Sequence, residues 1–151
     1  HCVTGVQTCA LPIFLHPPTE RITGSDNANS LVIRMDAAGR SLILPGDLEE
    51  PGVAYLINQP RPPVGGLLMA PHHGSLTIDS GRVLDWARPR ETIISGGRRA
   101  RRPEVLEMLR ATGSTVHLTN TDGAIRIRID RRGKIETRHW LDSPWSTGPL
   151  R

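Results

Sequence analysis

The sequence predicts an α/β or α+β fold, in which helices cover a β-sheet. Short, wholly apolar runs that suit buried strands alternate with stretches of helical character. Near the end of the chain, Ala124–Asp130 instead alternates strictly, with Ile125, Ile127 and Ile129 on one face and Arg126 and Arg128 on the other. This alternation is typical of a half-buried antiparallel strand. Together the patterns predict a sheet that contains both hairpins and strand–helix–strand units.

The expected elements begin and end with a hairpin. Leu15–Ser30 is expected to be a loop, because it contains three turn-forming Pro and Gly residues and an Asp/Asn/Ser cluster. Leu31–Met35 and Ser41–Leu44 then read as the two strands of a hairpin. The next elements are expected to be a helix at Glu49–Ile57, a strand at Leu67–Ala70, a helix at Val83–Ala87, a strand at Thr92–Ser95, a helix at Pro103–Thr112 and a strand at Thr115–Thr119.

The helix Pro103–Thr112 has the clearest end signals. Proline suits the first helical position, and Gly113 stands just past the expected end. After the next strand, Ala124–Asp130 turns into Lys134–Trp140 to form the second hairpin, and Leu141–Arg151 is expected to be a tail. A single partial domain is therefore expected over residues 15–140, followed by a tail at 141–151.

Composition excludes several protein classes. The chain has 151 residues, of which 37% are hydrophobic and 23% are charged, so it is unlike an intrinsically disordered protein. It contains no run of about 18 apolar residues, so no transmembrane helix is predicted within it. The net charge of +4 is compatible with a polyanionic partner but is too small to indicate one by itself.

The first fourteen residues are expected to be foreign to the natural protein. Val3–Ile13 matches the translation of a common short-read sequencing adaptor, and both cysteines, Cys2 and Cys9, lie in the segment His1–Phe14. We therefore leave residues 1–14 out of the expected fold, as one would a fusion tag. The remaining sequence has no cysteine and gives no disulfide argument.

Two motifs at expected strand ends carry residues typical of hydrolytic sites. Asp47 follows Gly46 after one strand, and the run His72-His73-Gly74-Ser75 follows another. Gly-Asp alone is also an ordinary turn dipeptide, whereas adjacent histidines are a denser signal, because imidazole binds zinc and similar ions. The Ser75 hydroxyl and the Gly-Ser amides can hold a phosphate oxygen. Asp47 and His73, 26 residues apart, can meet at one sheet edge as half of a di-metal site that activates water.

The other histidines show no pattern. His16, His117 and His139 are scattered along the chain, and each is expected to be a surface or packing residue.

The motifs resemble, in order and spacing, the metallo-β-lactamase-fold domain of ComEC/Rec2-type competence proteins, which import DNA. The resemblance covers roughly Leu15 to Ile129. It rests on the segments Asn29–Val32, Leu44–Glu49, Leu68–Ser75, Arg88-Pro89, Ile94–Gly97, Pro103–Leu106 and Thr121–Ile125.

The resemblance implies that the chain is the C-terminal half of an αββα sandwich. Asp47 matches the metal-bridging aspartate, and His73, directly before the glycine, is assigned as the last metal-ligand histidine. His72 then contacts a phosphate or a proton and, with Ser75, is a catalytic candidate, although the choice between the two histidines stays open. The implied cofactors are two divalent ions, Zn²⁺ or Mn²⁺, that generate a hydroxide to attack a phosphodiester. No small organic cofactor is expected.

The same resemblance implies a bacterial, membrane-associated parent protein. Its substrate would be single- or double-stranded DNA, its partner the membrane channel region of the same parent, and its location the extracytoplasmic side. The HxHxDH motif that supplies most ligands in this family is absent here, and Arg102-Pro103 stands where the family often has His-Pro. The chain is therefore expected to be an inactive fragment of a hydrolase.

Other interpretations stay open. The basic run Arg98–Arg102 is either a solvated loop or a rim that contacts phosphate, with Gly74, Arg98 and Arg99 as candidate phosphate contacts. A non-catalytic module that binds DNA or another polyanion is one alternative function. A hydrolase of the same fold that acts on a different ester or on a lactone is another.

Overall fold

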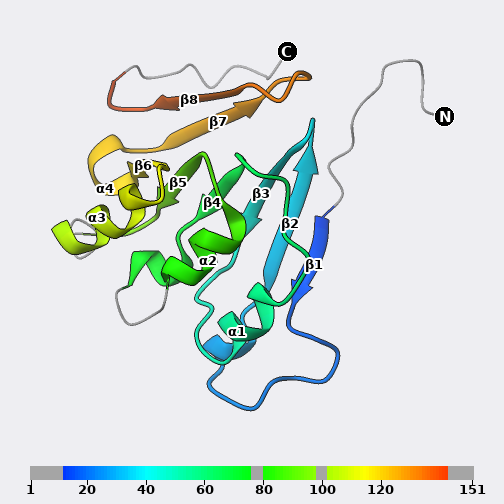
Figure 1. The fold of residues 1–151 in the computed structure, drawn as a ribbon. Coiled ribbons are helices and arrows are strands. Elements are labelled where there is room, and N and C mark those ends of the chain that lie inside the picture. The colour runs from blue at the N-terminus through cyan, green and yellow to red at the C-terminus, as the bar shows by residue number, and fades with distance from the viewer. Residues whose placement is uncertain (1–11, 76–79, 98–101, 143–151) are drawn as a thin grey trace.

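Six strands form one mixed sheet in the computed structural model, which describes residues 12–75, 80–97 and 102–142 (Figure 1). The sheet has the order β1-β2-β3-β4-β5-β6, and β7 and β8 form a separate two-stranded sheet. The strands are β1 (Pro12–His16), β2 (Val32–Ala37), β3 (Arg40–Leu44), β4 (Leu67–Met69), β5 (Glu91–Ile94), β6 (Thr115–Leu118), β7 (Ile125–Ile129) and β8 (Ile135–His139).

Helices connect the strands in the second half of the large sheet. The α-helices are α1 (Gly52–Ile57), α2 (Ser80–Ala87), α3 (Pro103–Ala111) and α4 (Thr119–Asp122). Two short 3₁₀ turns are η1 (Asn27–Asn29) and η2 (Pro71–Gly74). The mixed α+β class, both hairpins and each expected strand and helix are confirmed, with ends that differ by a few residues.

Strand direction changes midway across the large sheet. β1, β2 and β3 pair antiparallel, whereas β3 through β6 pair parallel. The carboxyl ends of β3, β4 and β5 therefore lie at the same edge of the sheet, so the loops that follow them are neighbours. The loops that carry Asp47 and His73 were predicted to be neighbours in this way.

The two faces of the large sheet are covered differently. On one face, α1, α2 and α3 pack over the main core, which includes the fully buried Leu68, Ile94 and Leu109 (Figure 1). On the other face, isoleucines of the β7–β8 hairpin pack against Leu67 and Ile93. The hairpin thus belongs to a second, smaller core.

The turn of this hairpin is closed by one carboxylate. Asp130 Oδ1 accepts hydrogen bonds from the backbone amides of Arg132 and Lys134, at 2.8 and 2.9 Å. These bonds, chiefly the one from Lys134, hold the pKa of Asp130 below its ordinary value, because they favour the ionised carboxylate. The turn between β7 and β8 is therefore fixed by its own sequence.

The expectation of a continuous loop over Leu15–Ser30 is wrong for its first two residues. Leu15 and His16 complete β1, which begins at Pro12 within the segment left out of the expected fold, and β1 pairs with β2. Backbone hydrogen bonds pair β1 with β2 at this sheet edge, where the Phe14 side chain stays 66% exposed, while Leu15 packs against the main core and His16 is buried. The domain boundaries at residues 14 and 140 stay predictions.

No helix among residues 12–75, 80–97 and 102–142 has both the length and the apolar character needed to cross a bilayer.

We expect Leu68→Ala to lower the free energy of unfolding by about 2–5 kcal/mol, because it opens a cavity at a fully buried site in the main core. Phe14→Ala, at an exposed apolar position, is the control and should change the free energy by less than about 0.5 kcal/mol. Urea unfolding measures both values. Equal losses in the two variants would contradict the assignment of the core.

Candidate metal centre

Asp47 and His73 meet at the carboxyl edge of the large sheet. Asp47 lies in the loop after β3, and His73 lies in η2 directly after β4. Asp47 Oδ1 and His73 Nε2 are 3.4 Å apart, and their side chains are 46% and 60% exposed. The pair predicted from the two strand ends is therefore brought together, and it is reachable from solvent.

A backbone hydrogen bond joins the two loops that carry this pair. The His72 amide donates to the Gly46 carbonyl at 3.0 Å. Both loops turn sharply here, since Gly46, His72, His73 and Gly74 all have positive φ, with values of 45° and 57° at the two histidines. Left-handed backbone at a residue with a Cβ costs free energy and is concentrated at functional sites. The strain at the histidines thus supports a functional role for this turn.

The orientation of His73 directs one of its ring nitrogens toward Asp47. Its Nδ1 lies 2.5 Å from the carbonyl oxygen of Ser95, just past β5. A carbonyl only accepts hydrogen bonds, so Nδ1 donates its proton to Ser95, and Nε2, on the Asp47 side of the ring, is the nitrogen that a metal ion beside this carboxylate would bind. Metal-binding histidines are held in this way, with the second ring nitrogen donating to a carbonyl or carboxylate. The arrangement favours His73 over His72 as a ligand.

His72 faces a different carboxylate. Its Nδ1 is 2.9 Å from Glu49 Oε1, within ion-pairing distance, although the two groups are not aligned for a hydrogen bond. Glu49 and the Ser95 carbonyl were not among the residues predicted to form the site. Glu49 stands two residues after Asp47 in the same motif, and that spacing was the only available signal for it.

The remaining predicted residues differ in what the structure places around them. Gly74 is buried, and a Cβ there would lie 3.3 Å from Ile94 Cγ2. The Ser75 amide donates to the His72 carbonyl at 3.0 Å, which closes the turn. Arg98 and Arg99 lie outside the described residues.

Comparison with known proteins gives three curated relatives. The chain is 32% identical to competence protein ComA of Neisseria gonorrhoeae, and the match covers 85% of this chain and 20% of ComA. It is 32% identical to ComE operon protein 3 of Bacillus subtilis, covering 72% of this chain and 14% of that protein. It is 31% identical to recombination protein 2 of Haemophilus influenzae, covering 85% of this chain and 17% of that protein.

This chain is a relative of the ComEC/Rec2-type competence proteins. The resemblance seen in its motifs is thereby confirmed. The chain spans 14–20% of the length of the relatives that it matches. No protein-family model matches it, and no solved structure matches it.

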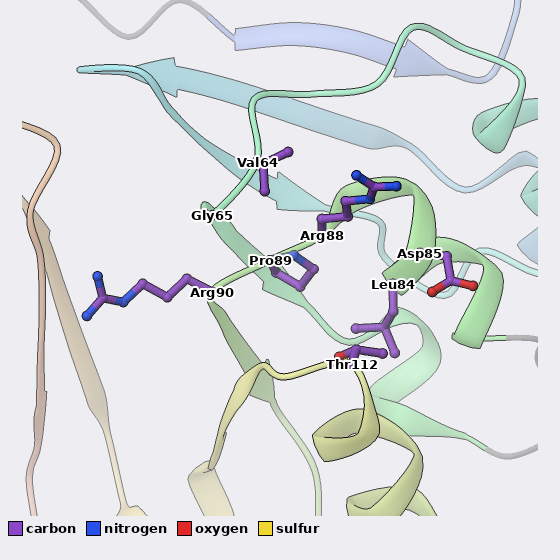
Figure 2. Close-up of a pocket in the computed structure, with 8 residues that line it drawn as sticks. All are labelled: Val64, Gly65, Leu84, Asp85, Arg88, Pro89, Arg90 and Thr112. Carbon is purple, nitrogen blue, oxygen red and sulfur yellow. The ribbon is translucent and has the colours of Figure 1, made fainter.

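A pocket of about 390 Å³ lies at the amino ends of the parallel strands, opposite the carboxyl ends that carry Asp47 and His73. Figure 2 shows the residues that line it. It is lined by residues that precede β4, β5 and β6, among them Gly65, Arg88 and Thr112. Asp47 and His73 are not among its lining residues. The pocket therefore takes no part in the candidate centre.

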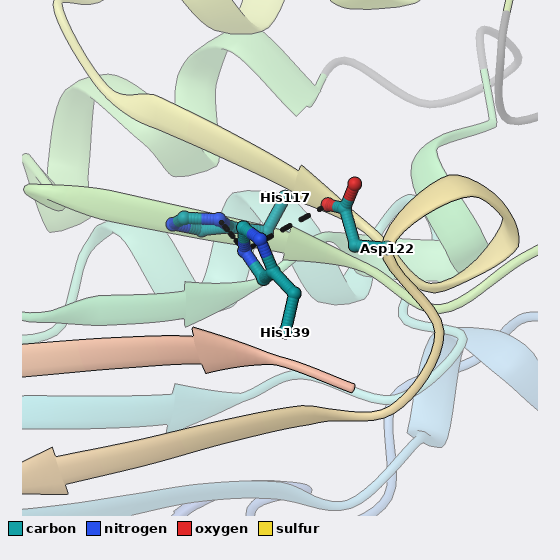
Figure 3. A group of neighbouring side chains, drawn as sticks. All are labelled: His117, Asp122 and His139. Atoms are coloured by element: carbon teal, nitrogen blue, oxygen red, sulfur yellow. Dashed lines mark hydrogen bonds and ion pairs between the residues drawn. The ribbon is translucent and has the colours of Figure 1, made fainter. Parts of the chain in front are cut away.

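His117 and His139, which were expected to be scattered, lie side by side in the structure, whereas their expected role as surface or packing residues stays a prediction. Their rings are in contact, and Asp122 joins them, so that ligand atoms of the three side chains lie within 4.8 Å of one another (Figure 3). Asp122 falls within the Thr121–Ile125 segment of the ComEC/Rec2 resemblance. Nothing in the spacing of these residues along the chain predicted the cluster.

We expect Gly74→Ala to destabilise the protein by about 1–2 kcal/mol, because a Cβ is strained at φ +75° and crowds Ile94. Gly97→Ala is the matched control, since a Cβ at Gly97 meets nothing within 4 Å and φ there is not positive. Thermal and urea unfolding measure the difference. If Gly74→Ala is as stable as the control, the turn does not depend on glycine.

Proposed function

We propose that Asp47 and His73 are ligands of a divalent-metal centre that hydrolyses phosphodiesters, in a metallo-β-lactamase-type domain of a longer DNA-uptake protein. The observation that carries the proposal is their separation. In a tetrahedral site with ligand bonds of 2.0–2.1 Å, donor atoms lie about 3.3 Å apart. Asp47 Oδ1 and His73 Nε2 are 3.4 Å apart, so they suit one shared ion without rearrangement.

The donor set fits the metals expected from the sequence. One carboxylate oxygen and one imidazole nitrogen suit Zn²⁺, and Mn²⁺ also accepts such ligands. Two protein ligands are fewer than one ion needs and far fewer than two ions need. We propose that the other ligands come from parts of a longer protein, since the relatives are five to seven times longer than the region matched here.

Bound metal would supply a water-derived hydroxide near neutral pH and neutralise charge on the phosphate. The residues of this chain then have separate roles. Asp47 and His73 hold the ligand positions, with the Ser95 carbonyl fixing the His73 ring. His72, held beside Glu49, binds a phosphate oxygen or moves a proton at its ring. The Ser75 hydroxyl is proposed to hold a phosphate oxygen.

DNA is the proposed substrate because the relatives are named as competence and recombination proteins. We further propose that the domain works beside the membrane channel region of the same parent protein, on the extracytoplasmic side. Gly74 would bring its backbone close to the phosphate, and Arg98 and Arg99 would contact neighbouring phosphates.

A second function is favoured by one surface. Arg126, Arg128 and Arg138 line a shallow depression on the β7–β8 hairpin together with Glu136. Clustered arginines bind phosphate oxygens, frequently in bidentate fashion. The alternative function is therefore a non-catalytic surface that binds DNA or another polyanion. Substitution of these arginines would then weaken DNA binding, whereas substitution of Asp47 or His73 would affect cleavage alone.

In the full-length protein, we expect Asp47→Ala and His73→Asn each to lower metal-dependent DNA cleavage at least about 100-fold, because each removes a direct metal ligand. DNA affinity, measured separately by fluorescence anisotropy, should change less than about threefold in either variant. Asp85→Asn is the control, because Asp85 lines the pocket at the opposite edge of the sheet. Full cleavage activity in the Asp47 and His73 variants would reject the centre.

The 151-residue chain by itself should show no metal-dependent cleavage, because Asp47 and His73 cannot hold two ions without further ligands. The measurement is a nuclease assay on the purified chain over a titration with Zn²⁺ and Mn²⁺. Cleavage that appears on metal addition and is absent in the Asp47→Ala chain would show that the proposed need for further ligands is wrong.

A further inference from the structure

A second group of potential ligands lies where the hairpin meets the large sheet. His117 comes from β6, Asp122 from α4 and His139 from β8, so three elements and both sheets contribute (Figure 3). His117 is buried, and the side chains of Asp122 and His139 are only about a quarter exposed. None of these residues takes part in the centre proposed at Asp47 and His73.

The outer ring nitrogens of both histidines face carboxylates. His117 Nε2 is 3.2 Å from Glu91 Oε2, and His139 Nδ1 is 2.9 Å from Asp142 Oδ2. An ionised carboxylate only accepts hydrogen bonds, so each outer nitrogen carries a proton. Glu91 is held in place by a hydrogen bond from the Thr137 hydroxyl of β8.

When both rings are neutral, the inner nitrogens are lone pairs that face each other. His117 Nδ1 and His139 Nε2 are 2.9 Å apart. Two lone pairs at this distance repel unless a proton or a cation lies between them. A histidine whose far nitrogen donates to a carboxylate is also the usual arrangement of a zinc ligand.

A third ligand atom points to a metal ion and not to a shared proton. Asp122 Oδ2 lies 3.9 Å from His139 Nε2 and is anchored by the Leu118 amide at 2.8 Å. The other oxygen of Asp122 accepts a hydrogen bond from the Thr121 hydroxyl. The separations of 2.9 and 3.9 Å bracket the value of about 3.3 Å between donors around a tetrahedral zinc ion, and ligand atoms of all three side chains lie within 4.8 Å of one another, so modest side-chain movements would complete the geometry.

We propose that His117 Nδ1, His139 Nε2 and Asp122 Oδ2 bind one zinc-type transition-metal ion, with water as the fourth ligand. Glu91 and Asp142 orient the two rings from outside. The ion links the β7–β8 hairpin to β6 and α4. It therefore stabilises the contact between the two sheets in addition to the small apolar core. Its role is structural, and it acts independently of the centre proposed for hydrolysis.

The test uses the 151-residue chain with competing ligands removed. Asp47→Ala and His73→Asn remove the other proposed centre, and Cys2→Ser and Cys9→Ser remove thiols, which bind zinc themselves. Co²⁺ and then Zn²⁺ are titrated into this background chain. We expect one equivalent of Co²⁺ to bind with the visible absorption of a four-coordinate site, and Zn²⁺ to displace it.

Substitutions then locate the ion. His139→Gln should abolish the Co²⁺ spectrum, and Asp142→Asn should weaken binding by about tenfold or more, as expected when the carboxylate that orients a ligand is lost. Glu136→Gln is the matched control, because this carboxylate lies on β8, the strand that carries His139, and pairs with Lys134 instead. It should leave the affinity unchanged.

A stability readout separates loss of the site from loss of the fold. Zn²⁺ should raise the Tm of the background chain and of Glu136→Gln, but not that of His139→Gln, since binding to the native state alone stabilises it. If His139→Gln does not fold by circular dichroism, Asp142→Asn decides the matter, because its side chain is 77% exposed. The proposal is overturned if the folded background chain binds no ion, or if Asp142→Asn binds as tightly as Glu136→Gln.

Discussion

The hydrogen bond from the His72 amide to the Gly46 carbonyl is the contact on which the candidate centre depends. It exists because β3 and β4 run parallel and side by side, so that their following loops leave the sheet at the same edge. The bond fixes one loop against the other and sets the distance between Asp47 and His73. The β5 end contributes the Ser95 carbonyl that orients the His73 ring. Three neighbouring strand ends thus build one small site from otherwise ordinary loops.

Much of this arrangement followed from local patterns. Apolar runs located the buried strands, the alternating isoleucines located β7, and the strand ends indicated where Asp47 and His73 would meet. The partners Glu49 and Ser95 were missed, because their roles depend on side-chain and carbonyl directions that a linear pattern does not contain. His117 and His139 were missed for a different reason. They belong to separate sheets, and only the packing of the hairpin across β6 brings them together.

The first residues of edge strand β1 show that a segment can pair at the edge of a sheet through its backbone alone. Pro12 to Phe14 were expected to be foreign sequence, yet the segment pairs with β2, because the exposed backbone groups of an edge strand accept almost any extended partner. Ile13 and Phe14 are 38% and 66% exposed and belong to neither apolar core. Pairing at this edge is therefore weak evidence that a segment belongs to the natural fold, whereas burial in the main core would be strong evidence.

The left-handed backbone at His72 and His73 has a consequence for how this site can vary. A residue at either position must supply an imidazole and must also tolerate positive φ. Asparagine tolerates positive φ but has no imidazole. An alanine substitution there alters the imidazole and the turn together, so its effect mixes two causes. Asparagine isolates the chemical contribution, while β-branched residues would mostly report backbone strain. Among natural variants, asparagine is accordingly the replacement that would keep the shape of the turn after its chemistry was lost.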